Sequence, residues 1–180
     1  MVKSGQSKVS SGGPLVSIGM PVYNGEGFVR QALESILIQD YLNFELIISD
    51  NASTDATSKI CGGTPTGTRV RYVRNETNLG ASPNHKRVFE MGTGDYLKWA
   101  AHDDECLPTF LSRCMSVFGE APQSVVLVYP QSLIIAGKGE WLGSSGARKF
   151  SGHFGRSAEA NFRTSAQSVE GVGRSEGTRS

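Results

Sequence analysis

Two adjacent carboxylates, Asp103 and Asp104, give this chain its clearest potential for chemistry. They follow an apolar, strand-like run at residues 95–101, and Glu105 stands beside them. Neighbouring like charges repel, most strongly where little water surrounds them, so the pair needs compensation. Mg²⁺ is commonly held by one or two carboxylates together with phosphate oxygens, and Mn²⁺ accepts similar ligands. The pair therefore predicts a Mg²⁺ or Mn²⁺ site that faces a diphosphate, with Asp104 as the stronger ligand candidate.

A structural interpretation of the same residues stays open. Acidic residues in front of Pro108, the expected first residue of a helix, are favoured by the positive end of the helix dipole. His102 is placed to contact phosphate or metal, but an isolated loop histidine is more often solvated.

Strand-like and helix-like segments alternate from residue 14 to about residue 136. Apolar, β-branched runs predict strands at residues 14–20, 44–49, 69–75, 95–101 and 124–130. Apolar stripes and capping residues predict helices at residues 28–39, behind Ser53 or Asp55, at 82–92 and at 108–118. This alternation is typical of an α/β fold with a mostly parallel sheet flanked by helices. Ligands of such sheets bind outside the carboxyl ends of the strands, where most of the polar candidates of this chain fall.

The order and spacing of these segments resemble the N-terminal, nucleotide-sugar-binding half of a glycosyltransferase family 2 enzyme of GT-A fold. The likeness rests on residues 16–55, on "NLG" at 78–80, on "GDYLKWAAHDD" at 94–104 and on "LP" at 107–108. It covers roughly residues 14–118. It implies transfer of a sugar, with inversion, from a UDP- or dTDP-sugar to a hydroxyl of an unknown saccharide or lipid-linked acceptor.

The resemblance also assigns roles to single residues. Asp103 and Asp104 match the pair that holds the metal ion and the donor diphosphate, although Ala101 replaces the first Asp of the commoner "DADD" form. Asp50 and Asn51 match two consecutive aspartates that read the base. Asn51 departs from that pattern, but its carbonyl is able to accept a hydrogen bond from a pyrimidine N3–H.

Three further residues complete the implied donor site. Pro21 and Tyr23 match residues that wall the nucleoside, for which a flat ring is suited. Gly80 belongs to an "NxG" loop in which glycine permits close approach of the backbone to a ligand. For Asp50, the alternative to contact with the base is an Asx-type turn. Lys86, on the helix that follows this loop, either reaches phosphate or belongs to a solvated basic face.

Inverting sugar transfer also needs a general base, which the family carries well after the metal motif and which we do not identify here. A truncated, non-catalytic nucleotide-sugar-binding module is therefore the alternative function. A nucleotidyltransferase would carry a basic residue after the first strand, where residues 19–27 have none, and a dehydrogenase would carry GxGxxG there.

Composition sets the domain limits and excludes other classes. We expect a flexible leader at residues 1–13, one domain at 14–142 and a disordered, Gly- and Ser-rich tail at 143–180. The net charge of +1 argues against a general nucleic-acid binder. The three cysteines are expected to be reduced thiols, and no apolar run has the length of a transmembrane segment. We expect a cytoplasmic protein, with peripheral association with a membrane left open.

Overall fold

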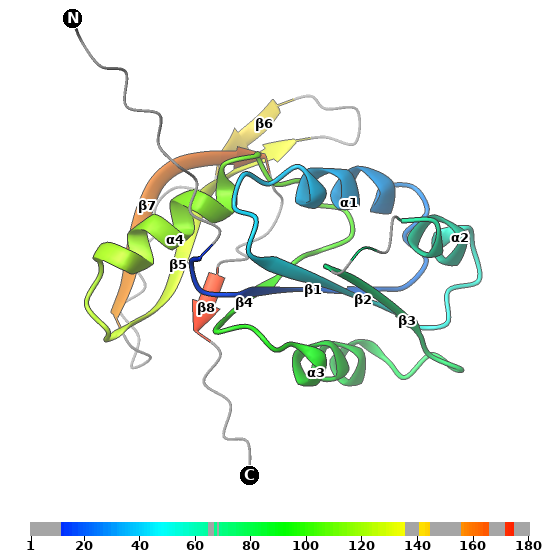
Figure 1. Ribbon diagram of the computed structural model, residues 1–180. Helices are drawn as coiled ribbons and strands as arrows, with labels where there is room; N and C mark the ends of the chain where they lie inside the picture. Colours follow the sequence, from blue (N-terminus) through cyan, green and yellow to red (C-terminus); the bar gives the residue numbers. More distant parts are fainter. Residues whose placement is uncertain are drawn as a thin grey trace, which may run out of the picture.

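The computed structural model describes residues 12–64, 67, 69–135, 141–144, 156–165 and 172–174. Every strand and helix predicted above is present within these residues, and the α/β class is confirmed (Figure 1). The elements are β1 (Val16–Val22), α1 (Val29–Leu37), β2 (Phe44–Asp50), α2 (Thr57–Gly62), β3 (Val70–Arg74), α3 (Ala81–Met91), β4 (Tyr96–Trp99), α4 (Phe110–Glu120), β5 (Val125–Ile135), β6 (Trp141–Ser144), β7 (Arg156–Ser165) and β8 (Val172–Arg174).

The sheet is built around four parallel strands in the order β3-β2-β1-β4. β1 and β2 pair from Val16 opposite Phe44 to Val22 opposite Asp50. Both strands are buried along almost their whole length, which is why their sequences are continuous apolar runs. β8 then joins β4 to β5 by antiparallel pairing, and β6 follows β5.

Two segments of the tail at residues 143–180 are drawn as strands, and the expectation that this tail is disordered stays a prediction. β7 pairs in parallel with β5, and β8 lies between β4 and β5. Strand pairing satisfies backbone N–H and C=O groups whatever the side chains, so a segment poor in large apolar residues can still extend a sheet. The rest of that tail beyond Ser144, and most of the expected leader at residues 1–13, lie outside the described residues.

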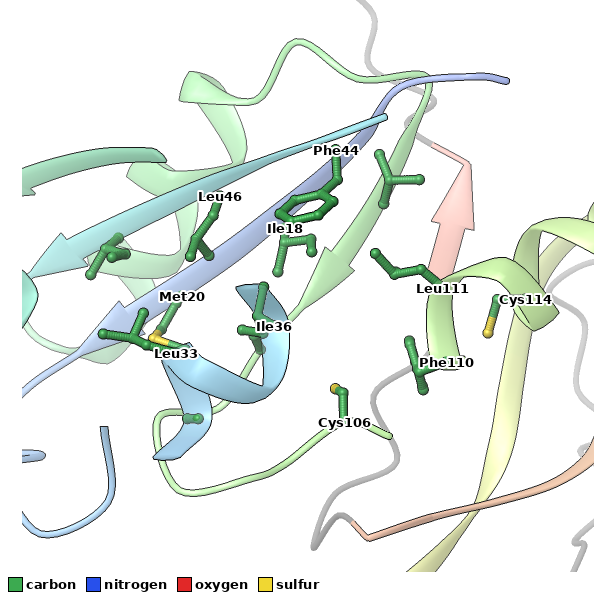
Figure 2. Close-up of a cluster of buried hydrophobic side chains, with 14 of the residues drawn as sticks. Ile18, Met20, Leu33, Ile36, Phe44, Leu46, Cys106, Phe110, Leu111 and Cys114 are labelled. Atoms are coloured by element: carbon green, nitrogen blue, oxygen red, sulfur yellow. The ribbon is translucent and has the colours of Figure 1, made fainter. Parts of the chain in front are cut away.

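Helices cover both faces of the parallel strands. α1 and α2 lie on one face and α3 on the other (Figure 1). Figure 2 shows Ile18 and Phe44 of the sheet directed toward Ile36 of α1, and the cluster continues to Leu111 of α4. Burial of each such side chain contributes about 1.5–3 kcal/mol.

α1 differs from its prediction at one end. Val29, Ala32, Leu33 and Ile36 form the expected buried stripe, but Phe28 precedes the helix and its side chain is 46% exposed. In the part of the chain that the structure describes, no helix has both the length and the apolar character needed to cross a membrane.

The three cysteines are buried and form no disulfide. Burial raises the pKa of the Cys61 thiol and of the Cys114 thiol to about 12, so almost no thiolate is present at neutral pH. We therefore expect the native protein at pH 8 to react very slowly with a thiol-specific disulfide reagent, and all three thiols to react rapidly in denaturant. Rapid stoichiometric labelling of Cys61 or Cys114 before unfolding would contradict this packing.

Candidate functional site

Four loops leave the carboxyl ends of β1, β2, β3 and β4. We call residues 23–28, 51–56, 75–80 and 100–109 the carboxyl-edge loops. Backbone hydrogen bonds continue the sheet ladder into them: the amide of Asn51 donates to the Val22 carbonyl at 2.8 Å, and that of Asn75 donates to the Asp50 carbonyl at 2.8 Å. The loops therefore begin side by side at the edge where ligands of parallel sheets bind.

The first and second loops are fastened by reciprocal hydrogen bonds. The Asn24 amide donates to Ser53 Oγ at 3.0 Å, and Asn24 Oδ1 accepts from the Thr54 amide at 2.8 Å. The Gly25 amide donates to Thr57 Oγ1 at 2.8 Å. Each bond satisfies a backbone donor that the turn leaves unpaired, so the two loops form one rigid unit.

A second reciprocal pair lies beside the start of α2. The Glu26 amide donates to Asp55 Oδ2 at 3.1 Å, and Glu26 Oε2 accepts from the Ala56 amide at 2.8 Å. Desolvation raises the pKa of the Asp55 carboxyl, but hydrogen bonds from Thr57 and Glu26 outweigh it, and the net shift is downward. Asp55 thus stays ionised and holds the loop across the whole neutral range.

Asp50 is fully buried, and both of its carboxylate oxygens accept hydrogen bonds. Oδ1 accepts from the amide of Ser53, three residues on, at 2.8 Å, so this bond is not the expected Asx-type turn, which bonds the backbone two residues on. Oδ2 accepts from the Tyr72 hydroxyl at 2.9 Å. Arg74 Nε lies 3.4 Å from the same Oδ2. Desolvation and then the hydrogen bond to Asp50 raise the pKa of Tyr72. Asp50 therefore ties β3 to the second loop.

Asn51 is 3% exposed and joins the second loop to the third. Its Oδ1 accepts from Asn75 Nδ2 at 2.8 Å and from the Leu79 amide at 2.9 Å. Its Nδ2 donates to Asn78 Oδ1 at 2.7 Å and to the Gly80 carbonyl at 3.2 Å. Gly80 has a φ of +85° and starts α3, a conformation that glycine adopts without steric cost.

The fourth loop carries Asp103 and Asp104 and is anchored to α1. Ser35 Oγ accepts from the Cys106 amide at 3.1 Å, and Gln39 Nε2 donates to the Leu107 carbonyl at 2.8 Å. Asp104 is buried at 8% exposure, whereas Asp103 is exposed. The loop is thus held to α1 on the side that follows the acidic pair.

His102 connects this fourth loop to the first. A Cβ added to Gly25 would lie 2.5 Å from His102 Cδ2, so the imidazole packs directly on the Gly25 backbone. His102 is therefore not simply solvated. Its contact places the residue before Asp103 beside the loop that begins with Tyr23, and all four loops are then linked to one another.

The remaining predicted residues lie at or near the same edge. Pro21 is the last but one residue of β1. Its missing N–H falls on the side toward β4, beyond Gly19, the last residue of β1 that pairs with β4. Tyr23 is 43% exposed at the start of the first loop, as a wall for a flat base would be. Lys86 pairs with Glu90 at 3.5 Å on the exposed face of α3, which agrees with a solvated basic face.

Sequence reasoning missed Asn24, Asn75 and Asn84. Their hydrogen-bond partners lie 9 to 35 residues away in the chain, so no local sequence pattern predicts these bonds. The one available signal was the density of Asn and Ser residues where strands end.

A divalent cation fits this edge only when phosphate and water supply most of its ligands. Within the described residues, no group of three or more His, Cys, Asp or Glu side chains is arranged to hold a metal ion. The oxygen pair of Asp103 and Asp104 is nevertheless a donor set that Mg²⁺ or Mn²⁺ accepts when phosphate and water oxygens fill the other positions. The edge is suited to a cation that arrives with a diphosphate.

The contact between His102 and Gly25 leads to a prediction about the first loop. Gly25→Ala should lower stability by about 1–3 kcal/mol, because the new methyl group overlaps His102 and approaches Val22 Cγ2 to 3.0 Å. Thermal unfolding measures the loss, and NMR of the imidazole reports the displaced ring. Gly27→Ala is the matched control, since nothing lies within 4 Å of its added Cβ. Equal stabilities of the two variants would refute the contact.

Comparison with known proteins gives one consistent family. A family model described as "Glycosyl transferase family 2" matches residues 17–165. An uncharacterized glycosyltransferase of Rickettsia typhi, RT0329, is 33% identical over 116 residues, which are 64% of this chain and 36% of that protein.

Solved structures share the fold. The crystal structure of S. aureus TarS 1-349 in complex with UDP-GlcNAc superposes with a TM-score of 0.63 at 20% identity, over 77% of this chain and 38% of that one. The mannosyltransferase PcManGT of Pyrobaculum calidifontis, in complex with GDP-Man and Mn²⁺, gives a TM-score of 0.58 at 23% identity, over 65% and 35%. The predicted GT-A fold is confirmed. The chain spans just over a third of the length of each of these three proteins.

Proposed function

This chain belongs to glycosyl transferase family 2, and from that membership we propose that it binds a nucleotide-diphosphate sugar over the carboxyl-edge loops and transfers the sugar, with inversion, to an acceptor hydroxyl. The observation that carries the proposal is the linkage of the four loops at one edge of the sheet, with Asp103 and Asp104 in the last of them. Pre-organised loops suit catalysis that consists of positioning and of stabilising charge on a leaving group.

Each part of the donor has residues suited to it. Tyr23 offers an aromatic face to the base beside Pro21, and Gly80 allows the third loop to approach the nucleoside. Asp50 and Asn51 remain the predicted residues on the base side, although both side chains already have protein partners.

Asp103 and Asp104 would hold Mg²⁺ or Mn²⁺ against the diphosphate. When bound, the cation neutralises the charge that develops on the departing diphosphate. The contact of His102 with Gly25 holds the loop of the two carboxylates beside the first loop. Complexes of the structural neighbours with UDP-GlcNAc and with GDP-Man and Mn²⁺ support this class of donor and cofactor. We further propose a saccharide or lipid-linked acceptor, met in the cytoplasm or at its membrane surface.

A second candidate is a nucleotide-sugar-binding module that transfers nothing. Ala101 favours it, since this residue stands where the commoner form of the acidic motif has a further carboxylate. The two candidates share the donor site and differ in turnover.

Calorimetric titration with UDP, dTDP, GDP and ADP, each with and without Mn²⁺, tests the proposal. We expect a pyrimidine nucleoside diphosphate to bind tightest and to require the metal. Failure of every nucleotide to bind would reject both candidates. Release of free sugar from the matching nucleotide sugar would separate the enzyme from the binding module.

A further inference from the structure

Five polar residues form a continuous hydrogen-bonded cluster beneath the third carboxyl-edge loop. We call Ser49, Asn51, Asn75, Asn78 and Asn84 the amide network. Asn84 of α3 donates from Nδ2 to the Ser49 carbonyl at 2.9 Å and accepts from Ser49 Oγ at 2.7 Å. Asn75 Nδ2 bridges Asn84 Oδ1 at 3.1 Å and Asn51 Oδ1 at 2.8 Å. The network thus connects β2, the third loop and the first turn of α3.

Every amide in this network has a fixed orientation. Asn75 must direct its NH₂ group toward two carbonyl oxygens, those of Asn51 and Asn84, because a flipped amide would bring oxygen against oxygen. Asn51 donates to the Asn78 and Gly80 oxygens and accepts from two N–H groups. A carboxylate accepts but does not donate, so Asp at position 51 would place negative charge against two oxygens. This polarity explains why the residue is Asn.

The network controls the backbone of the third loop. The Leu79 amide donates to Asn51 Oδ1, and the Gly80 amide donates to Asn78 Oδ1 at 2.8 Å. These bonds fix the segment that leads into α3 through the positive φ of Gly80. Ser49 and Asn84 are 0% and 2% exposed, so a ligand at the edge reaches neither side chain.

We propose that the amide network is a positioning device for the donor site: it holds residues 75–80 and the first turn of α3 against the carboxyl end of β2, so that this wall of the site exists before a nucleotide binds. Asn51 then acts on the nucleotide through the third loop, in addition to its proposed place on the base side of the site. This inference rests on the proposed function, because it needs a nucleotide at this edge.

The test compares two substitutions on the same face of α3 in the full chain. Asn84→Ala removes the member of the network that lies on α3. Val88→Ala, one turn later and 0% exposed, removes apolar packing against Gly19 and leaves the network intact. We expect Asn84→Ala to weaken UDP binding in the presence of Mn²⁺ by about tenfold. We expect Val88→Ala to lower the melting temperature at least as much, yet to stay within about twofold of the wild-type Kd.

Amide hydrogen exchange distinguishes a local change in the third loop from a general loss of stability. Asn84→Ala, and independently Asn51→Asp, should accelerate exchange at Leu79 and Gly80 while β1 and α1 keep wild-type protection. The proposal is overturned if Val88→Ala and Asn84→Ala lower the melting temperature equally and also weaken UDP binding equally. It is likewise overturned if Asn84→Ala and Asn51→Asp both keep the wild-type affinity for UDP. A wild-type protein that binds no nucleotide would instead reject the proposed function.

Discussion

Replacing Asp103 and Asp104 together by Asn is expected to abolish Mn²⁺-dependent binding of UDP, a loss of about 100-fold or more. Both carboxylates lie in the fourth loop, which is anchored to α1 through Ser35 and Gln39. Asn keeps the size of each side chain but removes the charge that a hard cation requires. Calorimetry with and without Mn²⁺ measures the loss.

The single variants rank the two carboxylates. Asp104 is buried and Asp103 exposed, so Asp104→Asn should cost more affinity than Asp103→Asn. Glu34→Gln, which removes an exposed carboxylate on α1, is the matched control and should bind as the wild type does. Metal-dependent binding that survives the double substitution would remove the basis for a cation site here. It would leave the helix-dipole interpretation of these acidic residues.

Local patterns were sufficient to predict β1 to β5 and α1 to α4. β1 and β2 are apolar on both faces because parallel strands in the centre of a sheet are covered twice, and α1 carries its buried stripe at helical spacing. Phe28, the first residue of the helix predicted at 28–39, lies outside α1 and is exposed. The chain turns at Gly25, whose carbonyl accepts the amides of Phe28 and Val29, so the helix begins one residue later.

β7 and β8 could not be predicted for a different reason. A strand is recognised by its side chains, but these two are placed by backbone pairing with β4 and β5. Residues 143–180 contain no Leu, Ile or Met, so the sequence carries no signal of that pairing.

The sequence predicts that the four loops lie together, but not the hydrogen bonds that join them. The carboxyl ends of parallel strands meet at one edge of a sheet, so the loops that follow them are neighbours. Ser49, in contrast, lies inside an apolar strand and gives no sign that it bonds Asn84, 35 residues away. Hydrogen bonds of this range depend on the folded topology, and the order of residues does not encode them locally.

Asp50→Ala is expected to be the most destabilising substitution at this edge, at about 2–4 kcal/mol. Removing the carboxylate leaves the Tyr72 hydroxyl and the Ser53 amide without their acceptor in a buried place. The contribution of Arg74 is smaller, because its side chain is 43% exposed and water screens the pair. Urea unfolding measures the change as a lower midpoint with an unchanged slope.

Two further variants, Glu34→Ala and Asp50→Asn, serve as controls for Asp50→Ala. Glu34→Ala, at an exposed position, should stay within about 0.5 kcal/mol of the wild type. Asp50→Asn keeps one acceptor oxygen for either Ser53 or Tyr72, so it should lose about half as much as Asp50→Ala. If Asp50→Ala instead unfolded like the wild type while UDP affinity fell, the carboxylate would serve the ligand and not the fold. If stability and affinity fall together, Asp50 is the residue through which the fold of β2 and β3 sets the shape of the donor site.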